Sequence, residues 1–255
     1  MTFIPIPPTL LDPSYDLDFD PAGHRYTYCG EILTSVTQVL KSYQKPFDGP
    51  TLAAQCALRR GVTAESLLAE WARVGEEASS QGNAVHEEGE RIACEIQCTN
   101  QVSFTPKYHN EEHLPKIRGL WNWFMDHWEL SQGWMCPELR VAWPEYQLAG
   151  TVDLVASNYN GVPAIIDYKT NKTIDIIGGY RNLLPPFQRG KLKLRDINFT
   201  TYALQLNAYR RILAERYDFH AERMVLVHLE GRGRYAEYDV PVMDTHIDKI
   251  LEARE

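Results

Sequence analysis

Two aspartates and a lysine stand near one another in the second half of the chain, in a pattern that suits metal-dependent chemistry. Asp153 begins the stretch DLVASNYNGVPAIIDYK, and Asp167 and Lys169 lie at its end. The stretch predicts two short strands joined by a polar turn. Because side chains alternate along a strand, Asp167 and Lys169 should point to the same face. Two carboxylates beside an ammonium suit a divalent cation, since Mg²⁺ prefers carboxylate oxygens and water.

A metal ion at this position would support hydrolysis of a phosphodiester. The reaction needs an activated water, neutralised charge in the transition state and help for the leaving oxygen, and metal ions supply all three. We expect Asp153 and Asp167 to be metal ligands, with a further oxygen from the backbone carbonyl of Tyr168. Lys169 would orient or deprotonate the attacking water, or stabilise charge. In the competing interpretation, Asp153 caps a turn and Asp167 pairs with Lys169 on a solvated strand.

Two predicted helices carry further candidate residues at one-turn spacing. His86 follows Gly82 by one turn; the glycine permits close approach of another backbone, and a neutral imidazole can bind a metal. Gln205 and Tyr209 are likewise one turn apart. Gln205 can hold a phosphate or the ligand shell, and Tyr209 can hydrogen-bond or stack on a base. Taken singly, a lone helical histidine is more typical of a structural or surface position, and the Gln205/Tyr209 pair is more typical of an ordinary amphipathic helix edge.

A basic segment separates the acidic strands from the second of these helices. It runs from Arg181 to Arg195 without an acid, in a chain whose formal net charge is −8. The net charge argues mildly against a nucleic-acid partner, but binding depends on where the charges cluster. Lys191, Lys193 and Arg195 alternate with leucine, so an extended conformation puts them on one side. We expect these three and Arg189 to bind DNA; the alternative is a solvated charged hairpin.

The bulk composition is that of an ordinary globular protein, with 44% hydrophobic and 24% charged residues among 255. No apolar run approaches the roughly 20 residues that span a membrane. The N-terminus lacks the basic start and long apolar stretch of a signal peptide. We therefore expect a cytoplasmic protein with no membrane partner. Five cysteines at scattered spacing do not suggest a disulfide framework.

Apolar periodicity predicts helices in the first half of the chain and a sheet in the second. After an extended arm at 1–23 and a hairpin at 24–33, helices are expected at about 34–43, 51–59, 64–74, 75–97 and 114–130. Strands are expected at 138–143, 148–156, 162–168, 223–229 and 235–240, with helices at 200–217 and 243–254. The expected fold is therefore α/β: an arm and hairpin over 1–33, then one domain over 34–255. This domain would be mainly helical over 34–136, with the catalytic sheet and its helices over 137–255.

The order of these motifs resembles the RecB-like branch of the PD-(D/E)XK nuclease superfamily. The similar elements are His86, Gly150-Thr-Val-Asp153, Ile-Ile-Asp167-Tyr-Lys169-Thr and Gln205-x-x-x-Tyr209. Within that branch the chain looks most like the mitochondrial genome maintenance exonuclease group and its phage and bacterial relatives. Upstream runs such as Ser35-Val-Thr-Gln-Val-Leu add to the likeness. Similar elements extend from about residue 34 to residue 210.

The resemblance implies a restriction-endonuclease-like core with a mixed central sheet flanked by helices. It also implies a site for one or two Mg²⁺ ions, for which Mn²⁺ would substitute. On this basis His86, Asp153 and Asp167 become metal ligands and Lys169 the catalytic lysine, and Gln205 and Tyr209 lie beside the site.

Two other family features concern glutamate and cysteine. Some relatives carry a glutamate before the aspartate strand, and either Glu138 or Glu145 fills that place here; the sequence does not choose between them. Some relatives hold an iron–sulfur cluster, with three cysteines after the glutamine/tyrosine helix. Here no cysteine follows Cys136, so we expect no iron–sulfur cluster.

The resemblance further implies cleavage of DNA, often from a free end of a single strand. The leading interpretation is a metal-dependent exonuclease acting on single-stranded or end-frayed DNA in recombination, repair or replication. It would act in a bacterial cell or a phage-infected host, alone, as a homo-oligomer or with a recombination or replication protein. A structure- or site-specific endonuclease is the first alternative, because a fold does not fix the activity. A non-catalytic DNA-binding protein is the second, although the complete Asp/Asp/Lys set argues against it.

Overall fold

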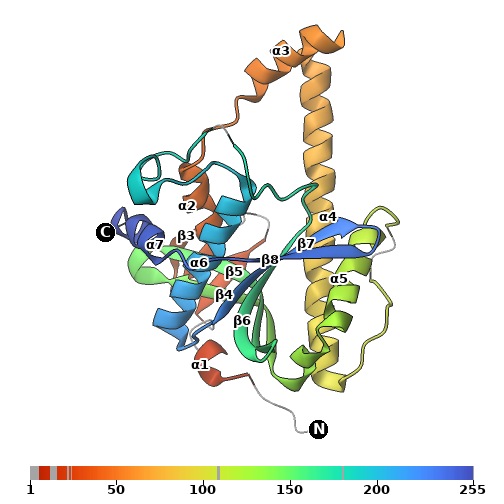
Figure 1. The fold of residues 1–255 in the computed structure, drawn as a ribbon, viewed down its shortest axis with the longest axis vertical. Coiled ribbons are helices and arrows are strands. Elements are labelled where there is room, and N and C mark those ends of the chain that lie inside the picture. Colours follow the sequence, from red (N-terminus) through yellow and green to blue (C-terminus); the bar gives the residue numbers. More distant parts are fainter. Residues whose placement is uncertain are drawn as a thin grey trace.

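The structure is a computed structural model that describes residues 6–11, 16–21, 23, 25–107, 110–179 and 181–254. Within these residues, eight strands form one mixed sheet, so the fold is α/β (Figure 1). Its five core strands are β4 (Met135–Trp143), β5 (Leu148–Tyr159), β6 (Val162–Lys169), β7 (Arg223–Gly231) and β8 (Arg234–Asp239). Neighbours in this order are antiparallel, except β6 and β7, which are parallel.

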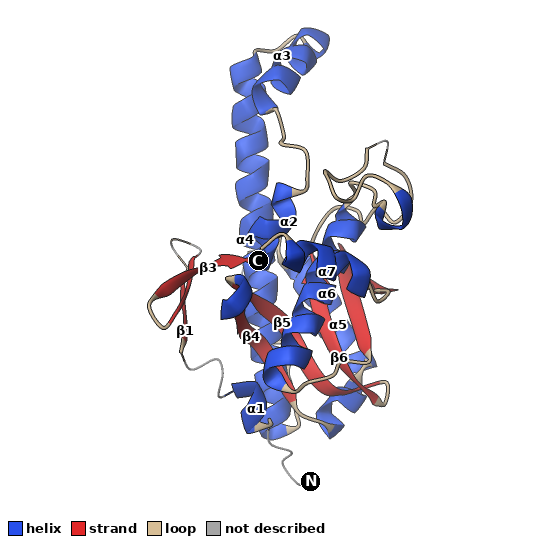
Figure 2. Cartoon of the chain, turned by 90° about the vertical axis from the view of Figure 1, so that its left-hand side faces the viewer, coloured by secondary structure: helices blue, strands red, loops and turns tan. Residues whose placement is uncertain are grey.

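Helices cover both faces of the core strands (Figure 2). One face carries α1 (Pro8–Leu11), α2 (Val36–Ser42), α6 (Asn198–Tyr217) and α7 (Asp244–Glu252), and the other carries α4 (Ala64–Thr99) and α5 (Leu114–Asp126). Parallel strands need a crossover connection, and the segment from β6 to β7 supplies it through α6. With both faces covered, most side chains of β5 and β6 are buried.

The sheet forks along β5. At its start, Leu148 and Ala149 pair in parallel with β3 (Glu31–Ser35). The pairing with β6 begins only at Leu154. In the described residues, the stretch from Gly150 to Asp153 therefore has a strand ladder on its β4 side alone. β3 belongs to an N-terminal three-stranded meander with β1 (Leu17–Asp20) and β2 (Arg25–Tyr28).

A helical arm projects from the body of the molecule (Figures 1 and 2). It consists of α3 (Gly49–Arg60) and the first turns of α4, which pack through a small cluster of Ala53, Ala57 and Leu67. α4 has 36 residues, which makes it about 54 Å long at 1.5 Å per residue. Residues 72–80, between the arm's tip and the body, are exposed on every side. Among the described helices, none combines the length and apolar character that crossing a bilayer requires.

The predicted hairpin and the five predicted strands are confirmed, with shifted ends. The helices expected at 64–74 and 75–97 instead form one continuous helix. Gly75 does not interrupt it, because a single glycine costs a helix only about 1 kcal/mol. The helix expected to reach residue 130 ends at Asp126, where His127 leaves the helical conformation and its Nδ1 donates to the Trp123 carbonyl at 2.9 Å.

The N-terminal arm also differs from expectation where it is described; residues 1–5, 12–15, 22 and 24 lie outside the described part. Residues 8–11 form a helical turn whose Leu10 is buried in the main core, and residues 17–20 form β1. Each element has only four residues, two of them apolar, which is too short a pattern to predict either one.

Candidate metal centre

Three side chains from separate elements converge at the fork of the sheet. His86 comes from α4, Glu138 from β4 and Asp153 from β5. His86 Nδ1 lies 3.3 Å from Glu138 Oε1 and 3.4 Å from Asp153 Oδ1. One potential ligand atom from each residue lies within 4.8 Å of the other two. This group of one nitrogen and two carboxylate donors has the composition of a divalent-metal site.

Of the two glutamates that the sequence left open, only Glu138 reaches this group. Glu145 lies in the short 3-10 turn η3 (Pro144–Tyr146), where its Oε1 accepts a hydrogen bond from Arg216 at 2.7 Å. Glu138 stands opposite Asp153, because the flanking residues of β4 and β5 keep an unbroken antiparallel register.

Glu138 adopts an unusual backbone conformation for a residue within a strand. Its φ is +47°, a left-handed conformation that side chains rarely adopt and that costs of order 1–3 kcal/mol. Such strain persists where the surrounding structure requires it, and it clusters at functional sites. The left-handed residue is thus the same residue whose carboxylate faces His86.

Asp153 has a structural bond in addition to its contact with His86. Its Oδ2 accepts a hydrogen bond from the backbone N–H of Tyr168 at 2.7 Å. The carboxylate thus ties β5 to β6 at the place where the strands separate, which leaves Oδ1 for the metal group. The Tyr168 side chain lies on the other face of the sheet, among Trp123 and Phe124. The Tyr168 carbonyl stays a predicted ligand.

The close packing expected at Gly82 occurs about two turns further along the same helix face, at Gly89. A Cβ on Gly82 would meet Thr170 Oγ1 at an ordinary 3.7 Å, whereas a Cβ on Gly89 would lie 2.9 Å from Tyr168 Cε2. Gly89 therefore lets α4 approach the sheet, and this approach brings His86 within reach of the carboxylates. Both glycines share the helix face of His86, so the sequence pattern alone did not distinguish them.

Asp167 and Lys169 point to the same face of β6, as strand alternation predicts. Lys169 Nζ lies 2.6 Å from Asp167 Oδ2, and both side chains are largely buried. Asp167 is not part of the three-residue group, because its carboxylate is directed to the lysine. The site thus consists of a metal group and an adjoining carboxylate–ammonium pair.

Burial and mutual charge shift the pKa values of these groups in different directions. Burial raises the pKa of Asp167 to about 6, against the opposing effect of Lys169. For Asp153, burial acts in the same upward sense, but the charges of His86 and Lys169 outweigh it and hold the pKa below its usual value. Burial would lower the pKa of His86, yet Asp153 and Glu138 raise it to about 10. Without a bound cation, a protonated His86 therefore neutralises part of the acidic cluster.

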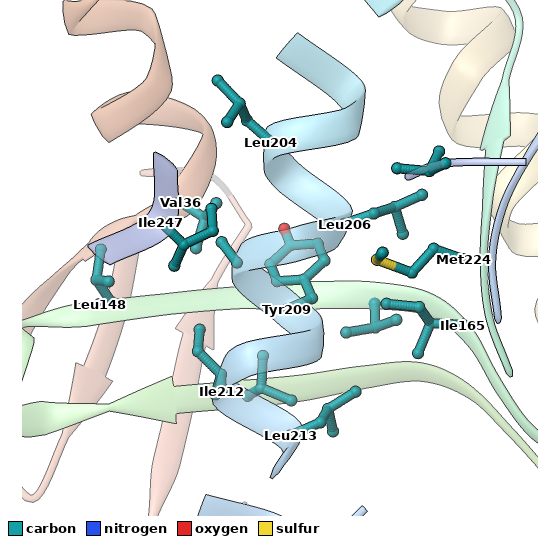
Figure 3. Packing of buried hydrophobic residues seen from close by; sticks show 14 of the residues in the cluster. Val36, Leu148, Ile165, Leu204, Leu206, Tyr209, Ile212, Leu213, Met224 and Ile247 are labelled. Carbon is teal, nitrogen blue, oxygen red and sulfur yellow. The ribbon is translucent and has the colours of Figure 1, made fainter. Parts of the chain in front are cut away.

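Gln205 and Tyr209 lie on α6, on the face that covers the fork. Gln205 Nε2 donates to the Tyr209 hydroxyl at 3.2 Å. The Tyr209 ring is within the buried cluster between α6 and the sheet (Figure 3), so it has no free face on which a base could stack. A Cβ on Gly150 would lie 2.5 Å from Tyr209 Cε1. The glycine therefore makes room for the ring against β5.

The four basic residues predicted to bind substrate are exposed on the segment between β6 and α6. They are Arg189, Lys191, Lys193 and Arg195. The segment is not extended throughout, because residues 190–192 form the 3-10 turn η4 (Gly190–Leu192). Buried Leu183 and Phe187 anchor the loop, and Phe187 packs on the rings of Tyr43 and His246. These apolar anchors require a compact loop, which the alternation of lysine and leucine did not reveal.

Two tyrosines beside the site were missed by sequence reasoning. The Tyr26 hydroxyl, on β2, lies 2.9 Å from Thr151 Oγ1 at the fork. Tyr202, on α6, places its ring centroid 4.6 Å from Lys169 Nζ. The three-residue spacing from Tyr202 to Gln205 was a signal that sequence could have used, because it continues the helix stripe of Gln205 and Tyr209. Tyr26 gave no such signal.

No family model matches this chain, and no curated protein is significantly similar to it.

Proposed function

We propose that this protein is a metal-dependent DNA exonuclease of the RecB-like PD-(D/E)XK type, acting on single-stranded or end-frayed DNA. One observation carries the proposal. His86, Glu138 and Asp153 converge at the fork of the sheet, and the Asp167–Lys169 pair lies on the adjoining strand. These residues are far apart in the sequence, yet the fold brings them together. An accidental Asp…Asp-x-Lys match would give no reason to expect His86 and Glu138 beside it.

The donor set fits Mg²⁺ or Mn²⁺. Carboxylate oxygens suit both ions. His86, Glu138 and Asp153 would hold the ion, with Asp167 as a further carboxylate on the adjoining strand. When bound, it would lower the pKa of a water molecule and neutralise charge on the phosphate.

The residues of the chain supply position and charge for the reaction. Asp167 holds the Lys169 ammonium at 2.6 Å, so Lys169 presents a fixed positive charge to the substrate phosphate and to the attacking water. Removal of water from around these buried groups strengthens their electrostatic effect on the transition state. The exposed cations of the loop around residues 189–195 support a DNA substrate, since phosphate contacts dominate nucleic-acid affinity.

Digestion of labelled DNA tests the proposal. Mg²⁺-dependent release of nucleotides is expected from 5′- or 3′-labelled single-stranded DNA, and covalently closed circles should resist. Lys169→Ala should abolish cleavage while leaving most DNA affinity intact. Unchanged cleavage by this variant would contradict the mechanism. Circles cut as fast as linear DNA would instead favour the endonuclease alternative, and DNA binding without any cleavage would favour the non-catalytic one.

A further inference from the structure

The face of α6 that covers the site also carries Tyr202, which has no role in the proposed mechanism. Tyr202, Gln205 and Tyr209 are spaced by three and four residues, so one stripe of the helix presents all three. The half-buried Tyr202 ring lies with its centroid 4.6 Å from Lys169 Nζ. The face of an aromatic ring attracts a cation at this distance, and more strongly where water is excluded.

Tyr202 is itself held in place through the end of β6. Its hydroxyl donates to Asn171 Oδ1 at 2.7 Å. The Asn171 carbonyl accepts from His228 Nε2 at 2.8 Å and is 3.4 Å from Lys116 Nζ. Since His228 stands beside Lys169 in the β6–β7 register, these bonds fix the chain two residues beyond the lysine. The ring and the lysine are therefore anchored to the same piece of backbone.

Lys169 is thus enclosed from two directions, by the Asp167 carboxylate and by the Tyr202 ring. A long lysine side chain has many rotamers, and fixing it before the substrate arrives removes an entropic cost from the reaction. We propose that Tyr202 is a positioning residue whose ring holds the Lys169 ammonium beside Asp167. This inference rests on the proposed nuclease function, in which Lys169 faces the substrate phosphate.

Two substitutions separate the ring from the hydroxyl. Under single-turnover conditions with saturating Mg²⁺ and DNA, Tyr202→Leu should lower the cleavage rate constant about tenfold, the equivalent of one moderate cation–π contact. Tyr202→Phe keeps the ring and should retain most of the rate. Phe199→Leu is the matched control, because it removes an aromatic ring from the first turn of α6 where that ring packs on Tyr238. Its rate should equal that of the unaltered protein.

The outcomes divide clearly. An unaltered cleavage rate constant in Tyr202→Leu would overturn the proposal. So would an equal loss of rate in Tyr202→Leu and Tyr202→Phe, because the effect would then come from the hydroxyl and not from the ring. Weaker DNA affinity with an unchanged rate at saturation would also overturn it, because the ring would then stack on the substrate. A lowered rate constant with unchanged affinity for DNA is the result that supports positioning.

A spectroscopic measurement tests the contact between Tyr202 and Lys169 independently of nuclease activity. In protein with ¹³C-labelled lysine, the ε-methylene signal of Lys169, assigned through Lys169→Met, should be shifted upfield by the ring current of Tyr202. Tyr202→Leu should remove the shift and Tyr202→Phe should keep it. If the protein cleaves no DNA, the proposed function fails while the shift still reports the contact. If the shift is absent, the positioning proposal fails whatever the activity.

Discussion

At the scale of single residues, Glu138 is the most informative position. Its left-handed backbone brings a carboxylate to His86, whereas Glu145 pairs with Arg216 on the surface. We expect Glu138→Gln to weaken Mn²⁺ binding about tenfold or more, a loss typical of changes around a metal. Glu145→Gln, the matched control, should leave Mn²⁺ affinity unchanged, since an exposed ion pair contributes little. Titration calorimetry measures both, and equal affinities would remove Glu138 from the ligand set.

The raised pKa of His86 gives metal binding a defined pH dependence. In the metal-free protein, Asp153 and Glu138 keep the imidazole protonated at pH 8, since its pKa is about 10. A metal-bound imidazole must be neutral, so binding should release close to one proton, and affinity should rise with pH up to about 10. Calorimetry in two buffers of different ionisation enthalpy counts the protons. The release should disappear in His86→Asn; its absence in the unaltered protein would contradict ligation by His86.

The sequence indicated Asp153, Asp167, Lys169 and His86 as one group, and the structure brings them close together. Local periodicity sufficed for Asp167 and Lys169, because both belong to one strand. It did not suffice for Glu138, because the residue types around it do not predict its left-handed backbone conformation. Proximity of His86 to the carboxylates required a helix and a sheet to pack, which a local pattern does not specify.

At the scale of elements, the contact between α6 and β5 depends on a glycine. A Cβ at Gly150 would overlap the Tyr209 ring at 2.5 Å, whereas Gly75 has open space around it. Gly150→Ala should therefore destabilise the protein by about 1–3 kcal/mol, as overpacked cores do. Chemical denaturation, followed by circular dichroism, measures this change in the free energy of unfolding. A fully stable Gly150→Ala protein would show that α6 does not need this close approach.

The same substitution at Gly75 should have the opposite effect, confined to the arm. Alanine in an exposed helix interior is favoured over glycine by about 1 kcal/mol. Residues 72–80 have no packing to oppose this gain. Gly75→Ala should slow amide hydrogen exchange in that stretch and leave exchange in the core strands unaltered. Faster or unchanged exchange around residue 75 would contradict a helix held only by propensity and by local pairs such as Arg73–Glu77.

The helices and strands themselves were easier to predict than the elements with which they pair or pack. The helix at 198–217 and the strands that flank it follow from apolar periodicity, which is a local property. The pairing of β3 with β5 joins residues 34 and 148, and no local pattern encodes such a distant register. The compact loop around Phe187 was missed for the same reason, because Phe187 packs on Tyr43, at the end of α2, and on His246, in α7.

At the scale of the whole molecule, charge is distributed unevenly. The net charge is −8, yet every charged residue of the loop at residues 189–195 is an exposed cation. We expect DNA affinity to fall with salt, and Lys191→Gln with Lys193→Gln to reduce the slope of log K against log salt by about 1.4, or 0.7 per lost single-strand phosphate contact. Arg25→Gln, on the N-terminal meander, should leave the slope unaltered. Fluorescence anisotropy across a salt series measures all three, and equal slopes would exclude the loop from the DNA interface.

The exposed residues 72–80 of α4 also determine how far the tip of the arm would move if the helix bent there. From Gly75 to Ala64, the first residue of the helix, the chain rises about 17 Å, so a bend of about 20° at the glycine would displace the tip by about 6 Å. Gly75, Ser79 and Ser80 are poor helix formers, and the exposed stretch has no packing to stiffen it. A small local distortion would therefore move the tip much further than the residues around His86, which are packed against the sheet.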